Sequence, residues 1–444
     1  MRVQFNRFVL DGEVRDQLFL RSYSHHLRCF KKAQKVPPMK VAFVNNMNNN
    51  FFSIVRYLRD RGIDAHLFIF DKIYDGFFPE ADTFEEVSSL NYIHLISQIS
   101  FRDFFNPFSI KVSRAIKKLK KELSEFDLVF VCGMVAFFER AGIKTDVFIP
   151  YGGDVYQLTD LFNYSIKKYF PYSSMMRYIE KYQRQAIQKT RAIISFASQD
   201  LKIRDAILNM GRQWIDWSMP MSYPVMSPDN VEQWSFLKKH DFVVFSHMRH
   251  TWKTGTDYNG NDRAIRGYAQ FIKNESRYNN PIFVLFEYGC DVTASKELVK
   301  ELDIEKYVCW VPAMQRKHIY AGLKRANVVL GIFNEKVISI GGVTYEAFSC
   351  ELPVIGCAKL QQTEDVHDLP LIHAFEVSEI AAALTEYQKN PGKFKHIGIQ
   401  SKQWFDRNVG QGIIDRYLEL IDLLLKHKNA RQEDKELQHL CYQG

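Results

Sequence analysis

The sequence predicts an α/β protein made of two tandem doubly wound domains. Short apolar strand patterns alternate with helical patterns in both halves of the chain, which is typical of parallel sheets covered by helices on both faces. The alternation is interrupted once, at about residues 211–239, and 444 residues suffice for two or three domains. Because ligands bind where strand order reverses, we expect the two domains to face a central cleft.

The first half begins its regular pattern abruptly after Pro37 and Pro38. Residues 39–45 are short, apolar and β-branched, as expected of a buried strand. Residues 51–61 carry apolar side chains at helical spacing, and Gly62 ends that helix. Further strands are predicted at 65–70, 128–132, 147–150 and 192–197.

The second half repeats this alternation after a segment rich in proline and aromatic residues. Strands are predicted at 242–246, 282–286, 308–311, 328–332 and 354–356, with helices at 262–273, 294–302, 317–324 and 344–350. A last helix at about 413–425 either crosses back to the first domain or packs on its own domain. The predicted segments are an N-terminal extension (1–38), a first Rossmann-like domain (39–215), a linker (216–240), a second Rossmann-like domain (241–405) and a C-terminal helix and tail (406–444).

Composition excludes several classes of protein. With 46% apolar and 25% charged residues, the chain is neither collagen-like nor disordered nor a coiled coil. Seven cysteines without a Cys-x-x-Cys pair do not indicate a disulfide framework or a zinc site, and they fit a reducing compartment. The longest apolar run, residues 128–138, is about half of what a membrane-spanning helix needs. The first thirty residues lack an apolar signal core, so we expect a cytoplasmic protein.

The net charge of +8 lies entirely in the first half, where residues 1–200 hold 29 basic and 21 acidic side chains. Two stretches carry much of it. Residues 110–126 combine an apolar stripe with six cations, and residues 164–191 mix seven cations with aromatic rings. Such patterns favour an anionic membrane surface, an anionic lipid-diphosphate acceptor or, less readily, nucleic acid. The alternative is a pair of helices packed on the core with solvated basic faces.

Two glycines stand directly before an apolar helix start in the second half. Gly341 and Gly342 allow a close backbone approach to a diphosphate, and the free N–H groups of a helix N-terminus attract it. Glu346, one turn later, is placed to accept hydrogen bonds from ribose hydroxyls. The alternative for Glu346 is a carboxylate favoured only by the helix dipole.

Three stretches together resemble the donor domain of GT-B fold glycosyltransferases of the retaining family 4. These are VCWVPAMQRKHIYAGLKRANVVLGIF (308–333), ISIGGVTYEAFSCELPVIG (338–356) and SKQWFDRNVGQGIIDRYLELIDLLL (401–425). The resemblance implies a nucleotide-sugar donor in the second domain, an acceptor in the first, retention of anomeric configuration, and closing helices that return to the first domain. The chain departs from the family's Glu-x7-Glu pair, because Ile338 stands where the first Glu is expected; Glu335 is the nearest replacement.

Cations follow the first strand of the second half in FSHMRHTWKTGTDYNGND. By the resemblance, Arg249 and Lys253 neutralise the donor diphosphate, whose charge grows as the glycosidic bond breaks. The flanking His247 and His250 are further candidates for phosphate contact. The alternative is a pair of exposed loop cations.

Acceptor-side candidates follow strands of the first half. In VFIPYGGDVYQL (147–158), the resemblance places the family's His-Gly-x-Asp turn, with Tyr151 at the His position, Gly153, and Asp154 as the catalytic candidate that orients or deprotonates an acceptor hydroxyl. Asp154 is equally placed to cap a helix. The Asn-rich loop that contains Asn48 and Asn49 follows the first strand and can hydrogen-bond a sugar, or it is a polar turn.

The sequence therefore predicts an enzyme, a hexosyltransferase-like glycosyltransferase that acts on a glycan, lipid-linked or surface polysaccharide precursor. No Asp-x-Asp motif occurs, so we expect no metal and no cofactor, the nucleotide-sugar being a substrate. The alternatives are a non-hydrolysing sugar-nucleotide epimerase, a non-catalytic GT-B protein and a polyanion-binding protein. Sugar, nucleotide and acceptor stay open at this point, and we do not expect nucleic acid as a partner. We expect peripheral association with the inner face of a membrane through the first half.

Overall fold

The computed structural model describes residues 39–72, 78–100, 109–164, 169–197, 200–217, 223–225, 231–254, 258–274, 276–334, 341–358 and 368–426. The predicted extension, 1–38, lies outside these residues. Within the described ranges, no helix is long and apolar enough to cross a membrane. The five cysteines described there are all free thiols.

The first sheet has seven strands in the order β3-β2-β1-β4-β5-β6-β7, and all of its pairings are parallel. This order begins with the 3-2-1-4-5-6 arrangement of Rossmann folds and extends it by one strand. Its strands are β1 (Lys40–Val44), β2 (Asp64–Lys72), β3 (Ile93–Ser100), β4 (Leu128–Val131), β5 (Val147–Phe148), β6 (Ala192–Ser195) and β7 (Ile215–Asp216).

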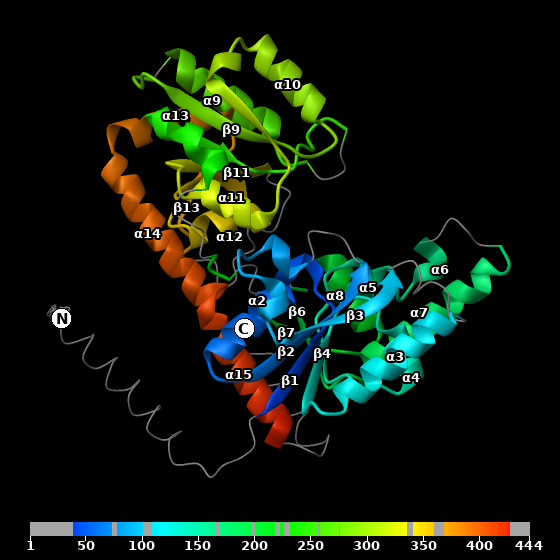
Figure 1. The fold of residues 1–444 in the computed structure, drawn as a ribbon. Helices are drawn as coiled ribbons and strands as arrows, with labels where there is room; N and C mark the ends of the chain where they lie inside the picture. Colours follow the sequence, from blue (N-terminus) through cyan, green and yellow to red (C-terminus); the bar gives the residue numbers. More distant parts are fainter. Residues whose placement is uncertain are drawn as a thin grey trace, which may run out of the picture. The chain divides into compact units, whose positions relative to one another are not determined.

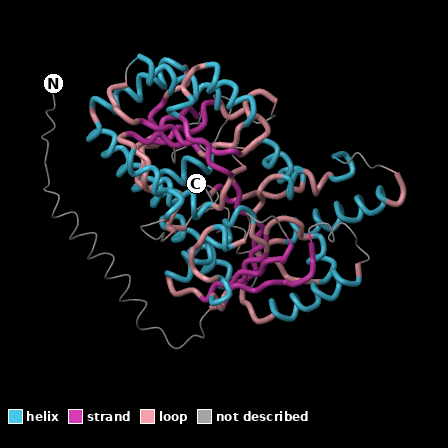
Figure 2. Tube along the Cα trace, turned by 45° about the horizontal axis from the view of Figure 1, so that its top comes forward, coloured by secondary structure: helices cyan, strands magenta, loops and turns pink. Residues whose placement is uncertain are grey.

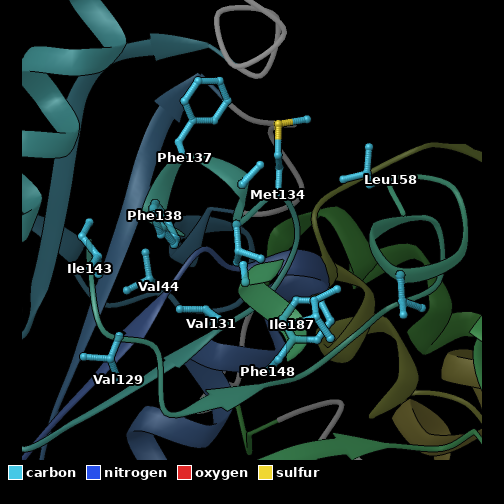
Figure 3. Packing of buried hydrophobic residues seen from close by; sticks show 14 of the residues in the cluster. Val44, Val129, Val131, Met134, Phe137, Phe138, Ile143, Phe148, Leu158 and Ile187 are labelled. Atoms are coloured by element: carbon cyan, nitrogen blue, oxygen red, sulfur yellow. The ribbon is translucent and has the colours of Figure 1, made fainter. Parts of the chain in front are cut away.

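Helices on both faces of this sheet bury its apolar strands (Figures 1 and 2). They are α2 (Asn50–Asp60), α3 (Ile110–Leu123), α4 (Ala136–Ala141), α5 (Gly153–Tyr156), α6 (Leu161–Tyr164), α7 (Tyr172–Lys189) and α8 (Leu201–Asn209). Figure 3 shows part of the core under α4 and α7, where Val131 and Phe148 of the sheet lie near Phe138 and Ile187 of the helices.

The apolar stripe of α3 belongs to this core as well. Val112, Ile116, Leu119 and Leu123 are each at most 4% exposed. The apolar stripe predicted at 110–126 therefore packs in the protein interior, and the cations of the helix lie on its exposed faces.

The second sheet has six strands in the order β10-β9-β8-β11-β12-β13, again with parallel pairings. Successive residues of a strand point to opposite faces. Thus Phe242 and Val244 of β8 pack in one core cluster, and Val243 and Phe245 pack in another. The strands are β8 (Phe242–Ser246), β9 (Pro281–Glu287), β10 (Val308–Pro312), β11 (Val328–Asn334), β12 (Val354–Ala358) and β13 (Leu371–His373). The helices are α9 (Asn261–Asn274), α10 (Val292–Glu301), α11 (Arg316–Leu323), α12 (Gly341–Ser349), α13 (Val377–Lys389) and α14 (Pro391–Asn408).

The final helix, α15 (Gln411–Lys426), returns to the first domain, as predicted. It packs against α2, and Asp415 lies 2.6 Å from the Nη1 atom of Arg61. The ring of Tyr417 lies beside Phe130 of β4, with 6.4 Å between ring centroids. Figure 1 shows α15, at the red end of the colour scale, beside α2.

The two parallel α/β sheets predicted from the alternation are confirmed, but three strands were not foreseen. β3 reads IHLISQIS, and its polar residues interrupt the apolar run that would have predicted a strand. β7 and β13 are only two and three residues long. The predicted linker contains a 3-10 helix, Glu232–Lys239, whose Trp234 is 2% exposed in the core of the second domain. The segment boundaries proposed above stay a prediction.

Candidate active site

Strand order reverses between β1 and β4 in the first sheet and between β8 and β11 in the second. In doubly wound sheets, ligands bind beyond the carboxyl ends of the strands at these points. The structure describes the loops after β1 and β4, and residues 247–254 and 258–260 of the loop after β8. They carry many of the side chains singled out from the sequence.

Glu346 lies in α12, five residues after the helix begins at Gly341. Its side chain is 13% exposed. Its Oε2 atom lies 2.7 Å from Nε2 of His247, and its Oε1 atom lies 3.1 Å from Nε of Arg316. Burial opposes ionisation, but the hydrogen bond from His247 and the charge of Arg316 together lower the pKa of Glu346. Glu346 is therefore an ionised carboxylate held between two nitrogen donors.

Arg316, the first residue of α11, joins this carboxylate to the first domain. Its Nη1 atom lies 3.0 Å from Oδ2 of Asp82, and its Nη2 atom donates to the carbonyl of Asn48 at 3.1 Å. All three nitrogens of one guanidinium are thus engaged. Burial works against the charge of Arg316, yet Asp82 and Glu346 raise its pKa above the ordinary value. One side chain therefore bridges the Asn-rich loop after β1 and the carboxylate of Glu346.

The side chain of Asp82 is 4% exposed, and the residue follows a 3-10 turn, Pro79–Ala81. Burial raises the pKa of Asp82 to about 6, although Arg316 and then Arg56 act in the opposite direction. The guanidinium of Arg56 lies between two rings, 4.1 Å from the centroids of Phe52 and of Tyr223. Asp82 thus lies between two cations in a nearly dry environment.

Residues 252–254 of the loop after β8 are held by one carboxylate. Asp291, 2% exposed, accepts the backbone N–H of Trp252 and of Lys253, each at 2.7 Å, and that of Thr254 at 3.1 Å. Burial opposes ionisation, but the Thr254 hydroxyl and these amides lower the pKa of Asp291. Gly289 has a φ of +119°, and a Cβ atom there would lie 2.4 Å from the His250 carbonyl oxygen. The loops after β8 and β9 are therefore in direct contact.

We expect Asp291→Ala to loosen residues 252–254 without unfolding the domain. The loop is partly exposed, so water can replace part of the lost hydrogen bonding, and the stability loss should stay near 1–2 kcal/mol. Limited proteolysis should cut the variant earlier in this loop than the parent. Glu297→Ala, which removes an exposed carboxylate from α10, the helix that directly follows Asp291, is the matched control. Equal cleavage of both variants would contradict the assigned role.

The predicted phosphate-binding cations lie on this loop. The side chains of Arg249 and Lys253 are exposed. His250 is different, because it is fully buried and its Nδ1 atom lies 2.7 Å from Oγ of Ser295. Burial lowers the pKa of His250 to about 4, so this histidine is neutral near pH 7 and supplies no positive charge to a phosphate.

The glycine pair begins α12 as predicted. Gly341 has a φ of +70°, and a Cβ atom there would lie 2.6 Å from Cδ1 of Ile332, so a larger residue would be both strained and crowded. Ile338 stands where the family has the first Glu of its pair, and Glu335 is the predicted replacement. Both residues lie outside the described ranges, so this replacement stays a prediction.

The Asn-rich loop after β1 uses left-handed backbone conformations, with φ of 74° at Asn45, 52° at Asn48 and 58° at Asn49. Asn tolerates this region better than most residues. Asn49 is buried and donates to the Phe78 carbonyl at 2.8 Å, whereas Asn48 is exposed. Of the two predicted acceptor-side amides, Asn48 is the accessible one.

Asp154 organises the turn after β5. It is 6% exposed; its Oδ1 atom accepts the N–H groups of Tyr151 and Gly152 at 2.9 Å, and its Oδ2 atom accepts that of Gly133 at 3.0 Å. Burial raises the pKa of Asp154, although these backbone donors act in the opposite direction. The carboxylate thus ties the turn that contains Gly153 to the loop after β4. Its predicted action on an acceptor hydroxyl stays a prediction.

The structure brings together Glu346, His247 and the Asn-rich loop after β1, and two residues that were not predicted, Arg316 and Asp82, take part in these contacts. Arg316 stands four residues after β10, so its place after a parallel strand was a usable signal. Asp82 follows no strand, and nothing local in the sequence distinguishes it. Among the described residues, no group of three or more His, Cys, Asp or Glu side chains is placed to hold a metal ion.

Neither a protein-family model nor a curated protein sequence matches this chain. Solved structures match it over most of its length. A glycosyltransferase from Rickettsia africae has a TM-score of 0.54 at 12% identity, covering 88% of this chain and 100% of that one. HepE from Anabaena, solved with UDP, has a TM-score of 0.53 at 13% identity, covering 86% and 99%. Sucrose-phosphate synthase from Thermosynechococcus elongatus has a TM-score of 0.52 at 13% identity, covering 86% and 98%. Likeness at these identities establishes the fold.

Proposed function

We propose that this chain, which has the GT-B glycosyltransferase fold, transfers a sugar from a nucleotide-sugar donor to an acceptor hydroxyl. One observation carries the proposal. An ionised, largely buried carboxylate, Glu346, lies in a helix that begins with two glycines beside the switch point of the second sheet. A carboxylate in this position suits ribose hydroxyls, and the helix N-terminus suits a diphosphate.

On the donor side, Glu346 binds the ribose, and the backbone at Gly341 and Gly342 approaches the diphosphate. Arg249 and Lys253, exposed on the loop that Asp291 fixes, stabilise the negative charge that develops on the leaving diphosphate. Fixed cations of this kind support transfer without a metal ion, and the family resemblance implies retention. HepE has been solved with UDP-glucose, which makes uridine nucleotides the first donors to test.

On the acceptor side, the candidates line the carboxyl edge of the first sheet. Asn48 presents an exposed amide, and Tyr151, Gly153 and Asp154 form the turn after β5. We assign Asp154 to positioning this turn and to the acceptor hydroxyl. Arg316 contacts Asn48 and Glu346 together, so it couples the donor and acceptor sides of the site.

A nucleotide-sugar panel tests the proposal by thermal shift and by turnover. A ligand at 100 times its Kd should raise the unfolding free energy by about 2.7 kcal/mol. Release of free nucleoside diphosphate upon addition of an acceptor sugar would then demonstrate transfer. Binding without turnover on any acceptor would indicate a non-catalytic GT-B protein, and the absence of any nucleotide-dependent shift would contradict donor binding.

We expect Glu346→Ala to weaken nucleoside diphosphate binding by about 1.5–3 kcal/mol, because it removes a charged acceptor of ribose hydrogen bonds. Isothermal calorimetry measures this directly. Glu351→Ala, an exposed carboxylate two residues after the same helix, is the control. An unchanged affinity in a folded Glu346 variant would remove the ribose assignment.

A further inference from the structure

A groove of about 510 Å³ lies between the edge strand β3 and helix α3, away from the switch point of the first sheet. Its floor is apolar, formed in part by Ile96 and Leu119, which are 6% and 1% exposed. Two large apolar side chains on its border are open to solvent, Leu95 at 56% and Ile110 at 69%. The volume falls within the range of small-molecule pockets.

Three cations border the same groove: Lys111, Arg114 and Lys118. All three are exposed. The one acidic residue among the lining side chains, Glu122, lies 3.7 Å from Lys118, so that pair is largely neutral. Lys111 and Arg114 give this apolar groove a positive border near the beginning of α3.

A second feature of the same domain is a group of exposed aromatic side chains. Tyr164, Tyr169, Phe170 and Tyr172, around the beginning of α7, are 53%, 62%, 80% and 38% exposed. In a parallel α/β sheet, crossover helices run antiparallel to the strands, so the first residues of α3 and α7 lie at the carboxyl edge of the sheet. Both helices pack against α4 in one layer (Figure 1). The aromatic residues and the positive border therefore lie toward the same end of one helical layer.

We propose that the β3/α3 groove binds a phosphate-bearing lipid and docks this end of the first domain on an anionic membrane. The acyl chain packs between Leu95 and Ile110 on the apolar floor, and Lys111 and Arg114 contact the phosphate. The exposed aromatic rings at 164–172 enter the interfacial region, where rings with an apolar body and a polar tip are favoured. Lipid binding is measured without turnover, so this inference does not depend on the proposed transferase activity.

A lipid fits these features better than nucleic acid. The groove floor and its border present aliphatic side chains, which offer no ring on which a base can stack. The cations follow one helix along a short groove rather than an extended track for a polyanion. A membrane lipid supplies both a phosphate group and an acyl chain at one position.

Vesicle co-sedimentation of the full chain tests the proposal, with phosphatidylcholine alone and with about a third phosphatidylglycerol. The parent should bind only the anionic vesicles. Lys111→Gln with Arg114→Gln should lower the partition coefficient roughly 30-fold, because each cation at an anionic surface contributes about a fivefold factor. Lys117→Gln with Lys121→Gln removes two exposed charges of the same helix outside the groove and should change binding less than about fivefold.

The apolar part is tested separately by Ile110→Ser, with Leu208→Ser, an exposed leucine at the end of α8, as its control. Only the first should weaken vesicle binding, with both variants equally folded by circular dichroism. If the Lys111/Arg114 and Lys117/Lys121 double variants lose vesicle binding equally, the groove is not the binding site. If the parent binds neutral and anionic vesicles equally, the phosphate contact is overturned. If inorganic phosphate, at the concentration of the lipid phosphate, releases the protein from the vesicles, the proposed contact with the acyl chain is overturned. Tighter binding of a single-stranded oligonucleotide, lost in the groove variant, would overturn the lipid in favour of nucleic acid.

Discussion

Arg316→Ala should lower the free energy of unfolding by about 3–5 kcal/mol at pH 7.5, the largest loss of stability that we expect from any single change. Removal of one partner of a buried ion pair leaves the other charge uncompensated. Here two carboxylates lose their cation at once, because Arg316 lies 3.0 Å from Asp82 and 3.1 Å from Glu346. Asp82 is the more deeply buried of the two carboxylates, since its side chain is only 4% exposed and that of Glu346 is 13% exposed.

The loss should depend on pH in a definite direction. Burial raises the pKa of Asp82 to about 6 while Arg316 holds it down, so the pKa rises further in the variant. An aspartate whose folded-state pKa exceeds its unfolded value binds more protons when folded, and its stability contribution grows as pH falls through that window. The deficit of the variant should therefore be smaller at pH 5.5 than at pH 7.5.

Urea unfolding at both pH values measures this difference. Lys324→Ala, an exposed cation immediately after the same helix, should change stability by no more than about 0.5 kcal/mol at either pH. A deficit for Arg316→Ala that is equal at both pH values would show that Asp82 does not carry the penalty. Arg316→Lys keeps the charge but offers one donor nitrogen in place of three, and should recover only part of the stability.

The same guanidinium has a consequence for the proposed reaction. Ribose hydroxyls that approach Glu346 meet a carboxylate already shared by Arg316 and His247. Under the proposed function, ribose binding at Glu346 would therefore alter the contacts of Arg316, which also reach the Asn48 carbonyl. This coupling follows from one side chain with three contacts, and it requires no long pathway through the protein.

Much of the fold was predictable because it depends on local patterns. The apolar runs at 39–45 and 242–246 became β1 and β8, and the glycines at 341 and 342 do begin α12. The place of Glu346 in this helix was also predictable, since it follows from a glycine turn and a helix start, whereas its role stays a prediction. Strand β3 was missed because an edge strand tolerates polar residues on its open side.

The ionic bridge was not predictable, because it depends on tertiary structure. Asp82 and Arg316 are separated by 234 positions in the chain, and neither belongs to a motif. Asp291 is a similar case, since its carboxylate binds backbone amides of a loop about 38 residues earlier, and any residues other than proline at 252–254 would supply those amides. Periodicity reports which face of an element is buried, but not which loop side chains meet.

Asp154→Ala should lower the free energy of unfolding by about 3 kcal/mol, the second largest loss that we expect. Three backbone N–H groups, those of Gly133, Tyr151 and Gly152, lose their acceptor, and each unsatisfied buried donor costs about 1–3 kcal/mol. Asp160→Ala, at a less buried position on the same segment, is the matched control.

Asp154→Asn separates the two roles of this carboxylate. Asn keeps one acceptor oxygen and the shape of the side chain, so much of the stability should return. It cannot take a proton from an acceptor hydroxyl, and loss of a general base lowers turnover by about 10²–10⁴-fold. If Asp154 acts on the acceptor, Asp154→Asn will stay folded and bind nucleoside diphosphate normally, yet lose turnover on this scale. If its turnover instead tracks its folded fraction across a urea series, the carboxylate only holds the turn after β5. The proton acceptor must then be another group at the carboxyl edge of the first sheet.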